Sequence, residues 1–87
     1  MRKNSVSIFP NPAASYANLI VADEKVSIES IKNITIYNTL GNKVVSVWGE
    51  GKEFIIKTDQ LGDGVYFYTL TSGNQLIGSD KFMISNR

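Results

Sequence analysis

The sequence predicts an all-β domain, an immunoglobulin-like antiparallel β-sandwich of about seven strands. Short segments alternate apolar or β-branched residues with polar ones, and this period of two is that of a half-buried strand. Gly, Asn, Asp and Pro separate the segments at intervals of roughly 8–12 residues, the spacing of small β-sandwiches. No window sustains the i, i+3, i+4, i+7 apolar stripe of an amphipathic helix.

The first strand, over residues 6–9, is expected to stop at a rigid corner. Pro10 and Pro12 flank Asn11, which fixes two φ angles near the proline value and removes two backbone donors. The residue before each proline is also pushed toward extended geometry. No strand can continue through this segment.

Turn residues separate the strands expected in the middle of the chain. Gly41 lies in one turn, and residues 49–51 supply a second glycine-rich turn. Residues 23–30 alternate less clearly and fit either a short edge strand or a loop that crosses between sheets. Ile34 and Ile36 are the expected core pair of their strand. The strands are expected over residues 17–22, 31–37, 43–48 and 53–58.

Two strands are expected at the end of the chain. A turn containing Gly64, which is expected at positive φ, leads into the strand over residues 65–71. Gly73-Asn74 predicts a tight type I′ hairpin turn because both residues tolerate positive φ. The final strand then covers residues 75–84, with a break near Gly78.

The strand over residues 65–71 is apolar on both faces, which is typical of a central strand. An exposed strip at Val65 and Phe67 would mark an interaction surface, but partial covering by neighbouring side chains is the favoured interpretation. The expected core side carries Tyr66, Tyr68 and Leu70, and the other side carries Val65, Phe67 and Thr69.

Length and charge limit the classes of partner. The chain of 87 residues makes one domain, expected over residues 5–87, with residues 1–4 as residual linker or cloning residues. Nine Lys and Arg against eight Asp and Glu leave a net charge of +1 with the signs interspersed. Nucleic acid and anionic membranes need a concentrated basic surface, so neither is expected as a partner. No apolar run approaches ~20 residues, so membrane insertion is not expected.

The sequence lacks the residues of the common catalytic and metal sites. It has no His and no Cys, which removes the commonest general base, metal ligand and thiol nucleophile. Asp59 and Asp63 are interpreted as turn residues rather than as a catalytic pair or a calcium site. The sequence therefore predicts no enzyme, no cofactor and no metal.

Four motifs follow one another along the chain: Phe9 to Ala13 with Pro10, Asn11 and Pro12; residues 34–44 around Gly41; Leu61 to Tyr68 with Gly64 and Tyr66; and Lys81, Phe82, Met83 and Ile84. Each motif alone is weak, but their order, spacing and position are specific. In this combination the chain resembles the type A C-terminal sorting domain of the Bacteroidetes type IX secretion system, also called the Por system. Asn38 stands where that family often has Asp.

The resemblance implies a cleavable address label. Such a domain follows a larger cargo domain in the same precursor and directs it through the type IX outer-membrane translocon. A sortase-like peptidase then removes the label. The implied location is the periplasm in transit, then the cell surface or the extracellular space.

Ten residues within these motifs are the expected recognition residues, although two of them, Gly64 and Tyr66, are expected to serve the fold more than recognition. The ten are Pro10, Asn11, Pro12, Gly41, Gly64, Tyr66, Lys81, Phe82, Met83 and Ile84. An edge near the C-terminal strand is the expected docking site for a partner strand, because edge strands offer backbone groups for pairing. A weak homodimer is left open.

The alternative function is an immunoglobulin-like accessory module that binds polysaccharide or bridges domains in a secreted enzyme. Flat aromatic rings stack on sugars. Removing the domain distinguishes the two functions, because loss of a label leaves cargo in the periplasm and loss of a binding module leaves secretion intact. The aromatic residues considered for a sugar-binding face are Tyr37, Trp48, Phe54, Tyr66 and Tyr68.

Overall fold

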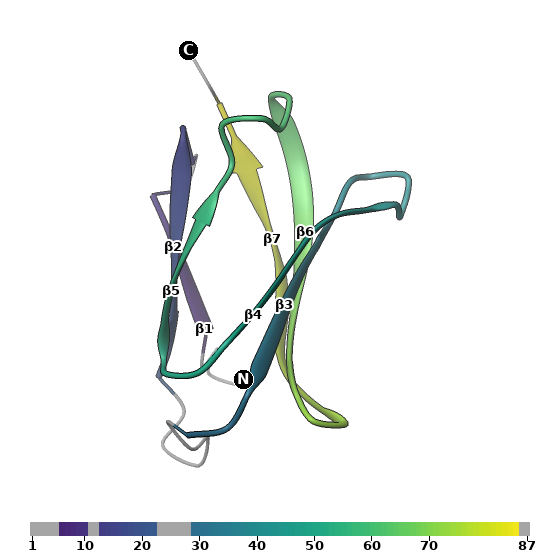
Figure 1. Ribbon diagram of the computed structural model, residues 1–87. Helices are drawn as coiled ribbons and strands as arrows, with labels where there is room; N and C mark the ends of the chain where they lie inside the picture. Colours follow the sequence, from purple (N-terminus) through teal and green to yellow (C-terminus); the bar gives the residue numbers. More distant parts are fainter. Residues whose placement is uncertain (1–5, 11–12, 23–28, 86–87) are drawn as a thin grey trace, which may run out of the picture.

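The computed structural model describes residues 6–10, 13–22 and 29–85, and within them seven strands form two sheets that pack face to face (Figure 1). The ends of these strands lie within one residue of those predicted, so the predicted fold class is confirmed. The strands are β1 (Val6–Phe9), β2 (Tyr16–Val21), β3 (Lys32–Tyr37), β4 (Lys43–Gly49), β5 (Glu53–Lys57), β6 (Gly64–Ser72) and β7 (Gln75–Ile84).

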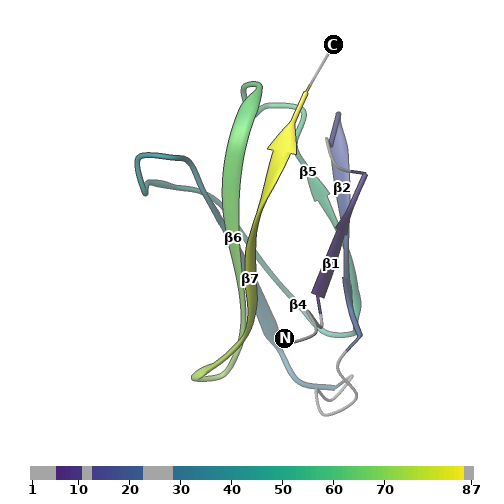
Figure 2. The ribbon, with the colours of Figure 1, turned by 180° about the vertical axis from the view of Figure 1, so that it is seen from behind.

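The strands divide between the sheets as in an immunoglobulin-like sandwich. One sheet has the order β1-β2-β5 and the other the order β4-β3-β6-β7, and every neighbouring pair is antiparallel (Figure 2). Lettered A, B, C, C′, E, F and G in chain order, the sheets read A-B-E and C′-C-F-G. β6 is therefore central in its sheet, and β7 is an edge strand.

Side-chain alternation places one face of each sheet in a shared core. Ile34, Ile36, Tyr68 and Leu70 are at most 1% exposed, as their strand patterns predict. The two sheets together exclude water from this layer, which is the main source of stability in a domain without disulfides. The other buried apolar side chains are Val6, Ala13, Ala17, Leu19, Val21, Phe54, Ile56, Tyr66, Phe82 and Ile84.

Between β1 and β2, which pair in the same sheet, the chain touches the edge of the other sheet after the predicted corner. β1 ends at Phe9, which is joined to Pro10 by a cis peptide bond. The chain then reaches the other sheet, where Ala13 forms a parallel bridge to Ile84 of β7. The predicted corner residues Asn11 and Pro12 lie outside the described residues. The link between β1 and β2 thus connects the three-stranded sheet to the edge of the four-stranded sheet.

The turn at Gly41 is closed by an asparagine side chain. Gly41 has a φ of 88°, and its N–H donates to the Asn38 carbonyl at 3.0 Å. The Asn38 Oδ1 accepts hydrogen bonds from the backbone N–H groups of Leu40 and Asn42, both at 3.0 Å. A carboxylate oxygen accepts such bonds equally well, so Asn can stand here in place of Asp.

The hairpin between β6 and β7 is present, but its turn type differs from the prediction. Gly73 has a φ of 62°. Asn74 does not have a positive φ, and among the described residues only glycines do. Positive φ at the first central position alone defines a type II′ turn, so the type I′ prediction is wrong. Asn74 tolerates positive φ but this turn does not require it.

The predicted break in the last strand is a β-bulge. The β6–β7 register shifts so that Leu70 lies opposite Gly78 and Thr71 opposite Leu76, which leaves Ile77 as the extra residue. A Cβ on Gly78 would lie 2.7 Å from Val6 Cγ2, so β1 approaches β7 closely at this glycine. Most of the ambiguous segment 23–30 lies outside the described residues.

Candidate recognition surface

The closing motif, Lys81 to Ile84, divides its side chains between the core and the surface, because successive residues of a strand point to opposite faces. Phe82 and Ile84 are each 2% exposed and belong to the core. Lys81 is exposed and Met83 is 49% exposed on the outer face of the four-stranded sheet. Two side chains of this motif therefore stabilise the core, and the other two are accessible at the surface.

The outer face of β6 runs beside the two exposed residues of the motif. Val65 lies opposite Met83 in the strand register, and Phe67 lies opposite Lys81. Val65 is 38% and Phe67 41% exposed. The strand is central, as predicted, and neighbouring side chains cover its outer face only in part, so the apolar strip at Val65 and Phe67 is open.

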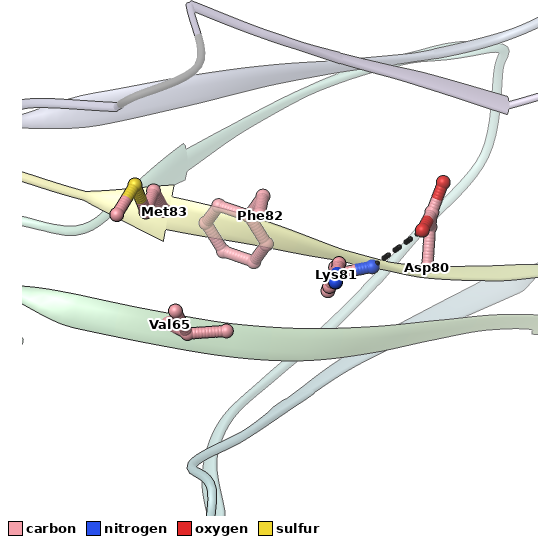
Figure 3. A pocket seen from close by; sticks show the side chains of 5 residues that line it. All are labelled: Val65, Asp80, Lys81, Phe82 and Met83. Carbon is pink, nitrogen blue, oxygen red and sulfur yellow. Dashed lines mark hydrogen bonds between the residues drawn. The ribbon is translucent and has the colours of Figure 1, made fainter.

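A shallow hollow of about 400 Å³ lies at this place (Figure 3). A second hollow, of about 370 Å³, adjoins it along the same two strands. We call the outward side chains of Val65, Phe67, Lys81 and Met83 the β6–β7 face. It combines an apolar strip with one cation. The first hollow is lined by Val65, Asp80, Lys81, Phe82 and Met83.

The edge of β7 is less open than its face. Ala13 N donates to the Met83 carbonyl at 2.8 Å, and Ser85 N donates to the Ala13 carbonyl at 2.7 Å, so Ala13 covers the C-terminal end of this edge. These bonds show that the backbone groups of Met83, and by alternation those of Lys81, point away from β6.

The middle of the same edge is covered by a carboxylate. The Asp80 Oδ1 accepts the N–H of Lys81 at 2.8 Å (Figure 3). The bulge at Ile77 distorts the lower end. A covering segment, a charged side chain and a bulge are the devices by which edge strands avoid pairing. The edge of β7 is therefore a poor template for the strand addition expected from the sequence.

Tyr66 and Gly64 lie where the fold needs them. The Tyr66 side chain is 9% exposed, and its hydroxyl donates to the Gly62 carbonyl at 2.8 Å. This bond has the form of a tyrosine corner at the start of strand F of an immunoglobulin-like sandwich. Gly64 has a φ of 144°, which favours glycine, as predicted.

The ring of Phe82 joins the closing motif to this corner. Its centroid lies 6.2 Å from that of Tyr66, at 36°, and 6.2 Å from that of Tyr68, at 58°. Tilted aromatic pairs at this separation are favourable. The buried side chain of Phe82 thus holds β7 in place by packing against two rings of β6.

The remaining predicted residues are spread over the molecule. Pro10 is exposed at the end of β1, and Gly41 is exposed at the tip of the β3–β4 turn, so neither adjoins the β6–β7 face in the strand order. Sequence reasoning missed Asp80 and the contact of Ala13, a residue of the first motif, with β7. Only the position of Asp80 next to Lys81 could have indicated a role, and nothing in the sequence relates Ala13 to Met83.

The aromatic residues considered for a sugar-binding face do not gather on one surface. Phe54, Tyr66 and Tyr68 are in the core. Trp48, 70% exposed, and Tyr37, half-buried, remain on the outer side. An aromatic platform of the expected composition therefore does not form.

The described part of the chain contains no group of three or more acidic, His or Cys side chains placed to hold a metal ion. No helix in that part is long and apolar enough to cross a membrane.

A comparison with models of known protein families identifies the family of this chain. The family described as the secretion system C-terminal sorting domain matches residues 7–85, which is most of the chain. A search of the curated proteins found no match. The four motifs and the tyrosine corner lie within the matched segment, and so do all seven strands apart from Val6. The chain therefore belongs to the family of C-terminal sorting domains of the Por, or type IX, secretion system, and is a secretion signal domain.

Proposed function

We propose that this domain is a type A sorting signal of a Bacteroidetes type IX system and that the secretion machinery reads it through the β6–β7 face. Lys81 and Met83 are the side chains that the machinery contacts, and Val65 and Phe67 form the apolar strip beside them. The observation that carries this proposal is the exposure of Lys81 and Met83 within a motif whose other side chains are buried.

The chemistry of the β6–β7 face suits a protein partner. An exposed apolar patch with a polar rim is typical of docking surfaces. Met83 is flexible and polarizable, so it adapts to a facing surface. Lys81 adds a charge whose attraction to an acidic partner steers the encounter. A patch of this kind requires neither nucleic acid nor membrane lipid as a partner.

The route follows from the same role. The domain stands behind a larger cargo in one precursor, crosses the periplasm with it and engages the outer-membrane translocon. A sortase-like peptidase then removes the domain, and the cargo stays at the cell surface or leaves the cell. The label itself performs no chemistry, which agrees with a sequence without His or Cys.

A reporter assay tests the sorting role. The domain is fused to the C-terminus of a reporter with a signal peptide, and surface display is compared in wild-type and translocon-deficient cells of a type IX host. We expect display only in the wild-type cells. Equal display in both strains would refute the sorting role.

Point variants of the same fusion test the β6–β7 face. Lys81→Ala and Met83→Ala remove exposed side chains, so far-UV circular dichroism and urea melts should match those of the native domain. Leu76→Ala is the control, because Leu76 is 58% exposed on the same strand but lines neither hollow. If each contact contributes about 1.4 kcal/mol, the variants bind about tenfold more weakly and display falls accordingly. Display of all three at the native level would refute this face while leaving the sorting role intact.

A further inference from the structure

We infer that the free edge of β5 pairs with the β5 edge of a second copy of this chain, so that two domains join their three-stranded sheets into one. The inference concerns self-association and does not depend on the sorting function. It specifies the surface at which a homodimer forms, on the sheet that does not carry the β6–β7 face.

The hydrogen bonds at the two ends of β5 show which of its backbone groups are used inside the sheet. Just before the strand, Val21 N donates to the Lys52 carbonyl at 2.8 Å. Just after it, Thr58 N donates to the Ser15 carbonyl at 2.9 Å. Because the direction of backbone groups alternates along a strand, the even-numbered residues of β5 point their N–H and C=O toward β2.

The odd-numbered residues Glu53, Ile55 and Lys57 therefore direct their N–H and C=O groups away from β2, to the free edge. Of the strands that the structure describes, only β2 pairs with β5. Among the described residues, no backbone hydrogen bond outside the β2–β5 ladder reaches these edge groups. The β2–β5 register also runs without a shift, so the edge is regular over its whole length.

The side chains of these residues are exposed as well. Ile55 is 69% exposed at the centre of the strand, and Glu53 and Lys57 are exposed at its ends. The alternate residues Phe54 and Ile56 are buried and hold the strand on the core. A large apolar side chain at the middle of an open edge is what edge strands normally avoid.

The sequence of β5 is complementary to itself in the antiparallel direction. A two-fold axis at Ile55 places Ile55 opposite Ile55 of the second copy and Glu53 opposite Lys57 of the second copy. Opposite charges directly across two strands stabilise the pairing by roughly 0.2–1 kcal/mol each. The residues that meet are those with free backbone groups, so each pair can exchange both of its hydrogen bonds.

The other edges are poorer candidates. β7 is covered by Ala13 and Asp80, and β1 stops after four residues at Pro10. β4 carries a register shift opposite β3, and its only charged residue is Lys43, so no opposite charges can pair across a two-fold axis. A single short strand makes a small interface, so the β5 dimer is expected to be weak and transient.

Cysteine cross-linking tests the inference directly, because the native chain has no Cys. Cα atoms of opposed residues in an antiparallel hydrogen-bonded pair lie about 5.5 Å apart, within the roughly 4.4–6.8 Å that a disulfide spans. We expect purified Ile55→Cys domain to form a covalent dimer under mild oxidation at least about tenfold faster than Ser46→Cys and Ser79→Cys. The two controls place a thiol at exposed positions on the edge strands β4 and β7. Equal rates, or no dimer of Ile55→Cys, would overturn the inference.

Charge reversal tests the register. Glu53→Lys or Lys57→Glu alone sets like charges opposite each other in the dimer, whereas the double variant restores opposite charges. Sedimentation over a series of protein concentrations should show weaker dimerisation for each single variant and recovery for the double variant, with unchanged circular dichroism throughout. A native domain that stays monomeric, or a double variant no better than the singles, would contradict the β5 pairing.

Discussion

Truncation of Tyr66 is the sharpest test of how the L-G-D-G-V-Y segment works. The ring is 9% exposed and lies 6.2 Å from that of Phe82, while the hydroxyl donates to the Gly62 carbonyl at 2.8 Å. Tyr66→Phe removes the hydrogen bond alone. Tyr66→Ala removes the ring as well.

The two substitutions differ in magnitude for a physical reason. Loss of the hydrogen bond costs about 0.5–1.5 kcal/mol, and Gly62 is exposed, so water can reach its carbonyl and keep the loss near the lower end. Loss of a buried ring costs about 3–5 kcal/mol, a large share of the roughly 5–15 kcal/mol that stabilises a small domain. Tyr66→Ala should therefore unfold a substantial part of the population and reduce export as a consequence.

Urea melts measure both values, provided that the slope m stays unchanged. Tyr16→Ala is the matched control, since Tyr16 is 48% exposed and its loss should change the free energy of unfolding by less than about 0.5 kcal/mol. If Tyr66→Ala lies within about 1 kcal/mol of the native domain, the assignment of Tyr66 to the core is refuted. Failed export with such unchanged stability would make Tyr66 a recognition residue.

Two further predictions concern the backbone and the pH dependence of stability. A Cβ would meet open space at both Gly64 and Gly62, but only Gly64 has a positive φ, of 144°. Gly64→Ala should therefore destabilise the domain by about 1 kcal/mol, and Gly62→Ala should stabilise it slightly. Equal urea midpoints for the two variants would contradict this. Burial, and then repulsion from Lys52, lowers the pKa of Lys32 below 10.5, although Glu50 opposes the shift. The unfolded chain then binds more protons, so the free energy of unfolding should rise as the pH increases from the lowered pKa toward 10.5. Urea melts over this pH range should show the rise for the native domain and not for Lys32→Met. The same dependence of the unfolding free energy on pH in both proteins would count against this prediction.

Local chemistry made the strands and their faces predictable from the sequence. The alternation around Ile34 and Tyr68 identified both core faces because a one-residue shift would have exposed them. Gly64 was predictable for a similar reason, since the entry into β6 needs a φ that other residues rarely adopt. Proline chemistry at Pro10 likewise fixed the end of β1.

Contacts between distant segments were not predictable in this way. The hydrogen bond from Ala13 to Met83 joins two residues near opposite ends of the chain, and neither side chain takes part in it. Gly73 and Asn74 both tolerate a positive φ, and the twist of the strands determines that only Gly73 adopts one, which gives the type II′ turn. Exposure of Met83 was implied by alternation, but the covering of the adjacent edge by Asp80 depends on a side-chain rotamer, which no sequence pattern specifies.

The meeting of the entrance and closing motifs affects how export mutants should be interpreted. Ala13 is fully buried and bonds to β7 on both sides of Ile84, so a variant at the corner would shift the strand that presents Lys81 and Met83. An export defect at Ala13 would thus arise without any contact between Ala13 and the machinery. Within the closing motif, only Lys81 and Met83 can lose their side chains without opening the core. A change in export at these two positions, with the urea midpoint unchanged, is therefore the result that separates recognition from folding in this domain.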